Sequence, residues 1–140
     1  MALHPQPEPP EWTSCLVVSN TSVPQSVSFP YAVDIDPDAV RVARENVEHN
    51  GLEKVIDVQQ GDLLQGLSRT FDFAVANILA PVICMLAAPL KKHLAENGTF
   101  VCSGIIKEAQ EDVRQALDNA GYIIDEVCHQ GDWVAFACHI

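Results

Sequence analysis

The sequence has little positive charge, with eight Lys and Arg residues against 19 Asp and Glu, which gives a net charge of -11. Proteins that bind nucleic acid gain most of their affinity by neutralising phosphates with Lys and Arg, and anionic membranes attract the same side chains. We therefore expect no direct nucleic-acid partner and no membrane partner. A basic protein or a cationic small molecule suits this negative field better.

Long hydrophobic runs are also lacking. No stretch approaches the roughly 18 uninterrupted apolar residues of a membrane span, and no basic residue precedes an apolar run at the N-terminus, as a secretory signal requires. A cytoplasmic location is the resulting expectation. The composition, 48% hydrophobic and 19% charged, is that of a globular protein of about one domain.

Metal-ligand spacing is absent from the sequence. The five cysteines form no CxxC pair and the five histidines form no HxxxH or HExxH motif. Zinc sites need clustered ligands, and four of the five cysteines stand among apolar neighbours, which is typical of small buried thiols. No metal site is therefore expected.

The chain changes character near residue 30. Residues 1–30 hold most of the nine prolines but no glycine, Lys or Arg, and this predicts a Pro/Ser-rich disordered or irregular segment. Within it, CLVV at 15–18 is the only strand-like run. In residues 31–140, apolar runs alternate with amphipathic segments, which predicts an α/β domain.

The alternation predicts a mostly parallel sheet that ends in an antiparallel hairpin. Asp36 is expected to cap a helix that starts at Pro37 and stops at Asn50-Gly51. Two further helices are expected, one over Val82 to Leu94 and one over 109–120. The expected strands are 31–35, 54–61, 71–78, 99–104 and the hairpin pair 122–129 and 133–139.

Polar residues follow three of these expected strands. Ligands of open α/β sheets bind outside the carboxyl ends of the strands, so we expect Asp34, Asp62 and Asn77 to face one crevice. Asp34 either accepts hydrogen bonds from two ribose hydroxyls or is an exposed acidic residue at the end of a strand. Asp62 either accepts a hydrogen bond from the exocyclic amine of adenine, with Leu63 packed on the ring, or is an acidic residue of a turn. Asn77 either orients an incoming amine through its side-chain carbonyl oxygen or forms a turn.

Four segments resemble the ribosomal protein L-eleven methyltransferase family, whose members methylate protein lysines. They are AVDIDPDAVRVARENVEHNG, FDFAVANILAPVI with its NILA at 77–80, GTFVCSGIIKEAQEDV and GYIIDEVCHQGDWVAF. The resemblance implies a Rossmann-like class I methyltransferase sheet and a ribosomal protein substrate. It also implies that Asp34 holds the ribose of S-adenosylmethionine, that Asp62 and Leu63 meet the adenine, and that Asn77 is catalytic at the methyl-transfer site.

The sequence departs from this family at the first strand and helix, which are truncated or replaced. The family has a glycine-rich cofactor loop after its first strand, but the first glycine here is Gly51. Residues 19–31 are too few for a comfortable parallel crossover after CLVV. If CLVV does not fill the central position, two bare strand edges would favour homo-association.

Two interpretations follow for residues 31–140 as a partial methyltransferase domain. One is a truncated S-adenosylmethionine-dependent methyltransferase that acts on lysine amines of a ribosomal protein. The other is a catalytically inactive remnant that acts as an interaction module or subunit. Loss of the glycine loop weakens or removes cofactor binding in either case.

Overall fold

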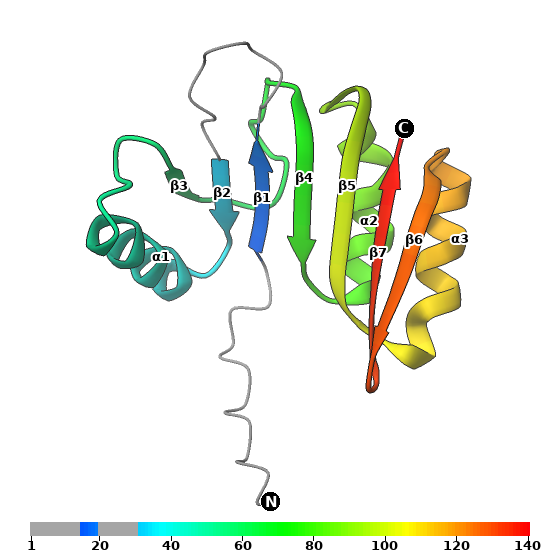
Figure 1. The fold of residues 1–140 in the computed structure, drawn as a ribbon. Helices are drawn as coiled ribbons and strands as arrows, with labels where there is room; N and C mark the ends of the chain where they lie inside the picture. Colours follow the sequence, from blue (N-terminus) through cyan, green and yellow to red (C-terminus); the bar gives the residue numbers. More distant parts are fainter. Residues whose placement is uncertain (1–14, 20–30) are drawn as a thin grey trace, which may run out of the picture.

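A computed structural model describes residues 15–19 and 31–140, and these build one seven-stranded sheet (Figure 1). The strand order is β3-β2-β1-β4-β5-β7-β6. The strands are β1 (Cys15–Ser19), β2 (Tyr31–Asp34), β3 (Asp57–Gln60), β4 (Phe71–Asn77), β5 (Leu94–Ile106), β6 (Ile123–Gln130) and β7 (Trp133–His139). The helices are α1 (Pro37–His49), α2 (Ala80–Lys91), the 3-10 turn η1 (Lys107–Ala109) and α3 (Gln110–Ala120). None of the helices in the described ranges is long and apolar enough to cross a membrane.

Most of the expected elements are confirmed. Asp36 caps α1 by accepting the backbone N–H of Asp38 at 2.9 Å, with Pro37 as the first helical residue. β6 and β7 form the expected antiparallel hairpin. The expected extension of the second helix to Leu94 is wrong, because α2 ends at Lys91 and Leu94 starts β5, where it is buried and pairs with Phe71.

The main hydrophobic core lies between the sheet and the helices α2 and α3. Side chains that alternate along the central strands are buried there, including Ala74 and Ala76 of β4 and Phe100 of β5. Tyr122 joins the two layers, since its hydroxyl donates to the Ala87 carbonyl at 2.7 Å. Figure 1 shows α2 and α3 on one side of the sheet.

Helix α1 covers the opposite face, next to β2 and β3. The connection from β2 through α1 to β3 joins parallel strands, and such crossovers are right-handed. α2 connects the parallel strands β4 and β5. The step from β4 to β5 runs across the sheet in the opposite direction to the step from β2 to β3, so a right-handed connection places α2 on the opposite face. Each face of the sheet thus receives helices over a different set of strands.

The central position of the sheet is filled by β1, which runs antiparallel to both of its neighbours. β2 and β4 are therefore parallel to each other. The antiparallel direction of β1 agrees with the expectation that residues 19–31 are too few for a parallel crossover after CLVV, whereas the expectation of a mostly parallel sheet is wrong around this strand. The physical reason is the length of the connection, because the residues between Ser19 and Tyr31 are enough to join antiparallel strands but too few for a crossover helix with two turns. Because β1 occupies this position, β2 and β4 are each paired with a strand on both sides.

Candidate active site

The strand register brings Asp34, Asn77 and Ser103 to one edge of the sheet. Cys15 pairs with Asn77, which is the last residue of β4. Asn77 in turn pairs with Ser103, which lies three residues before the end of β5. Leu16 pairs with both Val33 and Ala76. The residues that directly follow these two, Asp34 and Asn77, therefore lie at the same level of the sheet.

These three side chains also share a face. Side chains alternate along a strand, and Val33, Ala76 and Cys102 belong to the buried core on the side of α2 and α3. The residue after each of them therefore points to the face that carries α1. Asp34 and Asn77 are separated laterally by one strand, β1, so the structure brings these two predicted residues together.

Asp34 is nearly buried, with 9% of its surface exposed. Its Oδ1 accepts the backbone N–H of Asp36 at 2.9 Å, and its carbonyl accepts the N–H of Gly61 at 3.0 Å. These bonds hold the carboxylate at the start of α1. A carboxylate accepts up to about four hydrogen bonds, so this arrangement leaves acceptor capacity for a ligand.

Asp62 lies two residues beyond β3 and is exposed. Its carbonyl accepts the N–H of Gln65 at 3.0 Å, and its Oδ2 accepts the Gln65 side-chain amide at 3.3 Å. Leu63 packs against the hydrophobic core. Asp62 therefore forms a turn, and contact of these two residues with an adenine ring stays a prediction.

Asn77 is held by the neighbouring strand. Its Oδ1 accepts a hydrogen bond from the Ser103 hydroxyl at 3.2 Å. Gly104 has φ +78° and no side chain, and a Cβ at this position would lie 2.6 Å from the same Oδ1. The pair Ser103-Gly104 thus fixes the Asn77 amide, and Gly104 leaves the space that the amide occupies.

Replacing Gly104 with Ala is expected to lower the free energy of unfolding by about 2–3 kcal/mol. The variant combines an unfavourable left-handed backbone with a clash against Asn77. Urea denaturation measures the effect. The control is Gly66→Ala, because Gly66 has φ +75° with nothing within 4 Å of a new Cβ. Equal losses in both variants would show that contact with Asn77 contributes nothing.

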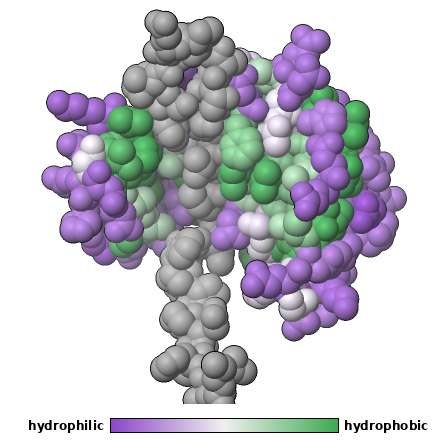
Figure 2. Space-filling model, in the orientation of Figure 1, coloured by the Kyte–Doolittle hydropathy of each residue, from purple (hydrophilic) through white to green (hydrophobic). Residues whose placement is uncertain are grey.

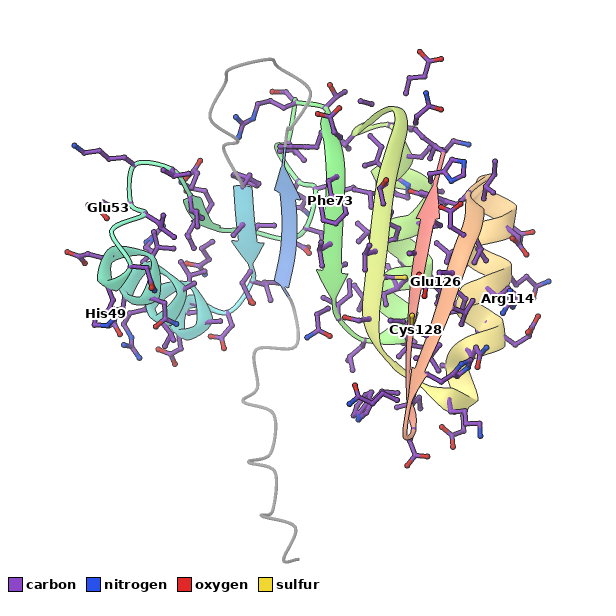
Figure 3. The ribbon with its side chains drawn as sticks, in the orientation of Figure 1. His49, Glu53, Phe73, Arg114, Glu126 and Cys128 are labelled. Carbon is purple, nitrogen blue, oxygen red and sulfur yellow. The ribbon has the colours of Figure 1, made fainter. Side chains whose placement is uncertain are left out.

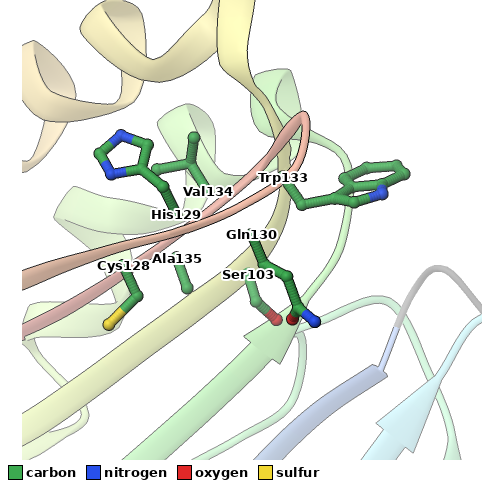
Figure 4. Close-up of a pocket in the computed structure, with 7 residues that line it drawn as sticks. All are labelled: Ser103, Cys128, His129, Gln130, Trp133, Val134 and Ala135. Atoms are coloured by element: carbon green, nitrogen blue, oxygen red, sulfur yellow. The ribbon is translucent and has the colours of Figure 1, made fainter.

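A shallow pocket of about 360 Å³ lies beside Ser103, between the end of β5 and the hairpin (Figure 4). It is lined by Ser103, Cys128, His129, Gln130, Trp133, Val134 and Ala135. Since Ser103 contacts Asn77, the pocket adjoins the predicted transfer site.

The sequence alone predicts no role for Ser103, Gly104 or the pocket residues. Ser103, Gly104 and Trp133 lie in two of the segments that resemble the family. A serine and a glycine together at the end of an apolar strand are a signal of close backbone packing. The partner of that packing, Asn77, is distant in sequence and emerges only from the register of β4 and β5.

The chain matches known proteins over most of its length. Residues 18–139 match the model of the family "Ribosomal protein L11 methyltransferase (PrmA)". A ribosomal protein L11 methyltransferase of Desulforamulus reducens is 38% identical over 122 residues, which cover 87% of this chain and 40% of that protein. The chain thus spans about two fifths of the length of this relative.

Solved structures agree with this match. The crystal structure of ribosomal protein L11 methylase from Lactobacillus delbrueckii subsp. bulgaricus is 34% identical, with a TM-score of 0.74 over 77% of this chain and 56% of that chain. An RNA methyltransferase of Salinibacter ruber, solved in complex with S-adenosyl-L-homocysteine, has a TM-score of 0.60 at 20% identity over 77% of this chain and 63% of that chain, and shows a shared fold alone. This chain belongs to the ribosomal protein L11 methyltransferase family.

Proposed function

We propose that this chain contributes the nucleoside end and the acceptor end of a methyl-transfer site. The reaction is transfer of a methyl group from S-adenosylmethionine to a lysine amine of a ribosomal protein, in the cytoplasm. The observation that carries the proposal is the placement of Asp34 and Asn77 at one edge and on one face of the sheet. Family membership supplies the reaction and the substrate class.

The nucleoside end of the cofactor fits the residues present. A carboxylate at the end of a second parallel strand is placed to accept two ribose hydroxyls, and Asp34 is fixed there by the N–H of Asp36. Asp62 and Leu63 follow the neighbouring strand β3, where an adenine ring would extend from the ribose. These roles are proposals that rest on position and family.

The methionine end of the cofactor does not fit the described residues. Family members approach this end with a glycine-rich turn after the first strand. Here β1 is reversed, so its last residue, Ser19, pairs with Phe73, which lies four residues before Asn77 on β4. Residues 20–22, which follow CLVV in the sequence, lie outside the described residues.

At the acceptor end, the chain's contribution is to position an amine. When bound, S-adenosylmethionine supplies an electrophilic methyl group on a sulfonium. The Asn77 amide oxygen, fixed by Ser103 at 3.2 Å, can accept a hydrogen bond from an incoming neutral amine. Desolvation favours the neutral form of a lysine, and orientation of reactants contributes several kcal/mol to such transfers.

The surface around the site suits a protein substrate. Four large hydrophobic side chains at this edge are about half exposed or more: Ile35, Leu79, Ile106 and Trp133. An exposed apolar rim of this kind marks a surface for a macromolecule. The net charge of -11 favours a basic partner, and both features support a basic protein over a small neutral metabolite.

Transfer of labelled methyl groups to ribosomal protein L11 tests this function. We expect slow transfer at millimolar S-adenosylmethionine, reduced at least about tenfold in Asn77→Ala, because the amine loses its orienting acceptor. Asn119→Ala on α3 is the matched control, since Asn119 is exposed and outside the site. Transfer that is equal in both variants would remove Asn77 from the proposed role.

The second candidate function is that of a non-catalytic subunit. It is favoured by the reversed direction of β1, because its last residue, Ser19, pairs with Phe73 and does not lie at the level of Asn77. Cofactor binding without any transfer to ribosomal protein L11 would support this candidate over catalysis by the chain alone.

A further inference from the structure

β6 is the last strand in the order of the sheet, and β7 is its neighbour on one side. β6 is eight residues long, and six of these residues are exposed, among them Ile123 with 57% of its surface. A strand in this position presents a row of backbone N–H and C=O groups that can pair with another chain. An extended polypeptide can therefore add to the sheet at β6.

The turn of the hairpin determines which backbone groups of β6 face outward. A two-residue turn closes the hairpin on the pair Gln130 and Trp133. In an antiparallel pair, residues that bond to the partner strand alternate with residues whose N–H and C=O point the other way. Counted from the closing pair, Cys128 faces β7, whereas Val127 and His129 direct their backbone groups to the outer edge of β6.

The charge beside this edge is negative. Residues 107–139 hold seven Asp and Glu against two Lys and Arg. On β6, Asp125 pairs with His139 at 2.8 Å, whereas Glu126 is exposed and accepts a hydrogen bond from the Cys128 thiol at 3.4 Å. Figure 2 shows mostly hydrophilic surface on the side where β6 and α3 lie, and Figure 3 marks Glu126 and Cys128 on β6. A segment rich in Lys or Arg is complementary to this edge.

A second copy of this chain is a poor occupant of the same edge. Two β6 strands paired side by side would bring Asp125 and Glu126 of one copy close to those of the other, and opposed like charges destabilise a strand pair. The net charge of -11 on each chain adds a repulsion of longer range. The irregular pairing between Ile124 and Glu126 also limits regular strand pairing to the part of β6 near the turn. The edge thus favours a basic strand over a copy of itself.

We propose that the β6 edge binds an extended, lysine-rich segment of the protein substrate, which adds to the sheet as a further strand. Strand addition takes its affinity from main-chain hydrogen bonds and its specificity from alternate side chains. The docked segment pairs with Val127 and His129 and places Lys side chains beside Glu126. That the partner is the methylated protein rests on the function proposed above, whereas the docking itself does not.

The docked segment lies away from the methyl-transfer site. Four strand spacings separate it from β4, which carries Asn77, and at 4.7–4.9 Å per spacing this distance is about 19 Å. Since this distance exceeds the length of any side chain, the methylated lysine is not one of the docked lysines. An extended chain covers about 3.3 Å per residue, so at least about six residues separate the docked segment from the methylated lysine.

The test titrates the full 140-residue chain with a short peptide of alternating Lys and Val, in the absence of cofactor. Amide hydrogen exchange, followed residue by residue by NMR, locates the contact. We expect saturable binding that slows exchange at Val127 and His129 at least about tenfold, because their N–H groups become bonded. The amide of Cys128, which faces β7, should keep its rate. A peptide of alternating Glu and Val is the control and should not bind.

Glu126→Lys should weaken binding of the Lys–Val peptide at least about tenfold, because it reverses the charge beside the edge. Glu53→Lys is the matched control, since it changes the net charge equally at an exposed position away from β6 (Figure 3). This control should weaken binding less than about twofold, and circular dichroism checks that both variants are folded.

Slowed exchange at the two outward amides together with the expected difference between the variants supports the proposal. It is overturned by binding that leaves these amides unprotected, by equal losses in the two variants, or by no saturable binding at millimolar peptide. A dimer of the unaltered chain in which these amides are already protected also overturns it, since a second copy then occupies the edge. Peptide binding as expected with no methyl transfer to ribosomal protein L11 supports the docking and contradicts only the function proposed above.

Discussion

Asp34→Asn is expected to weaken binding of S-adenosylmethionine by about 10- to 100-fold. The substitution keeps Oδ1 as an acceptor for the N–H of Asp36, so the start of α1 should stay in place. It removes the negative charge and one acceptor oxygen, and charge-assisted hydrogen bonds contribute about 1.5–3 kcal/mol each. Calorimetric titration of the two chains gives the ratio directly.

The matched control for Asp34 is Asp36→Asn, which removes the same charge two residues away. Asp36 caps α1 through the N–H of Asp38, and asparagine is as good a cap as aspartate. This variant should bind the cofactor as the unaltered chain does. If the two variants lose affinity equally, the effect comes from net charge, and the ribose role of Asp34 is wrong.

The second large effect is loss of stability in alkaline solution. Burial raises the pKa of Cys102 to about 12, with the nearby Cys138 as a smaller cause, and burial also raises the pKa of Cys138 to about 12. Both thiols are fully shielded from solvent, and the Cys138 thiol donates to the Phe100 carbonyl at 3.3 Å. The folded state therefore resists ionisation of both groups.

Stability falls as the pH rises because the thiols ionise more readily in the unfolded chain than in the folded chain. In the unfolded chain a thiol ionises near its ordinary pKa of about 8.5, while in the folded chain it stays protonated. The stabilisation is complete below about pH 8.5 and is lost as the pH rises toward 12. We expect the free energy of unfolding to fall by about 3 kcal/mol or more between pH 8 and pH 11, as measured by urea denaturation.

Replacing both buried cysteines with alanine should flatten this alkaline profile, although it lowers stability at neutral pH. Cys128→Ala is the control, because the Cys128 thiol is exposed and its loss should change the slope little. Burial also raises the pKa of Tyr122, so a residual fall above pH 10 is expected in the double variant. A profile that stays as steep as that of the unaltered chain would contradict the assignment to these thiols.

Local features of the fold could be predicted from the sequence because their causes are local. Asp36 and Pro37 start α1 through side-chain capping and a fixed φ. The turn at Gly131 joins two alternating runs that form the hairpin. The ends of β2 and β4 were placed closely enough to single out Asp34 and Asn77.

Features that depend on distant pairing could not be predicted in the same way. An apolar run such as CLVV has no direction in its composition, and only the short connection to Tyr31 argued against a parallel crossover. The contact of Ser103 and Gly104 with Asn77 needs the register of β4 on β5. Leu94 fits a helical period as well as a strand start, and burial beside Phe71 decides for the strand.

The most direct test compares adenosine with S-adenosylmethionine as ligands of the full chain by calorimetric titration. We propose that the described residues bind the nucleoside end of the cofactor and not its methionine end, so the two dissociation constants should agree within about threefold. Asp34→Asn should weaken both to the same extent. A nucleoside site at this edge of the sheet is contradicted if S-adenosylmethionine binds more than tenfold tighter than adenosine, or if neither ligand binds saturably at millimolar concentration.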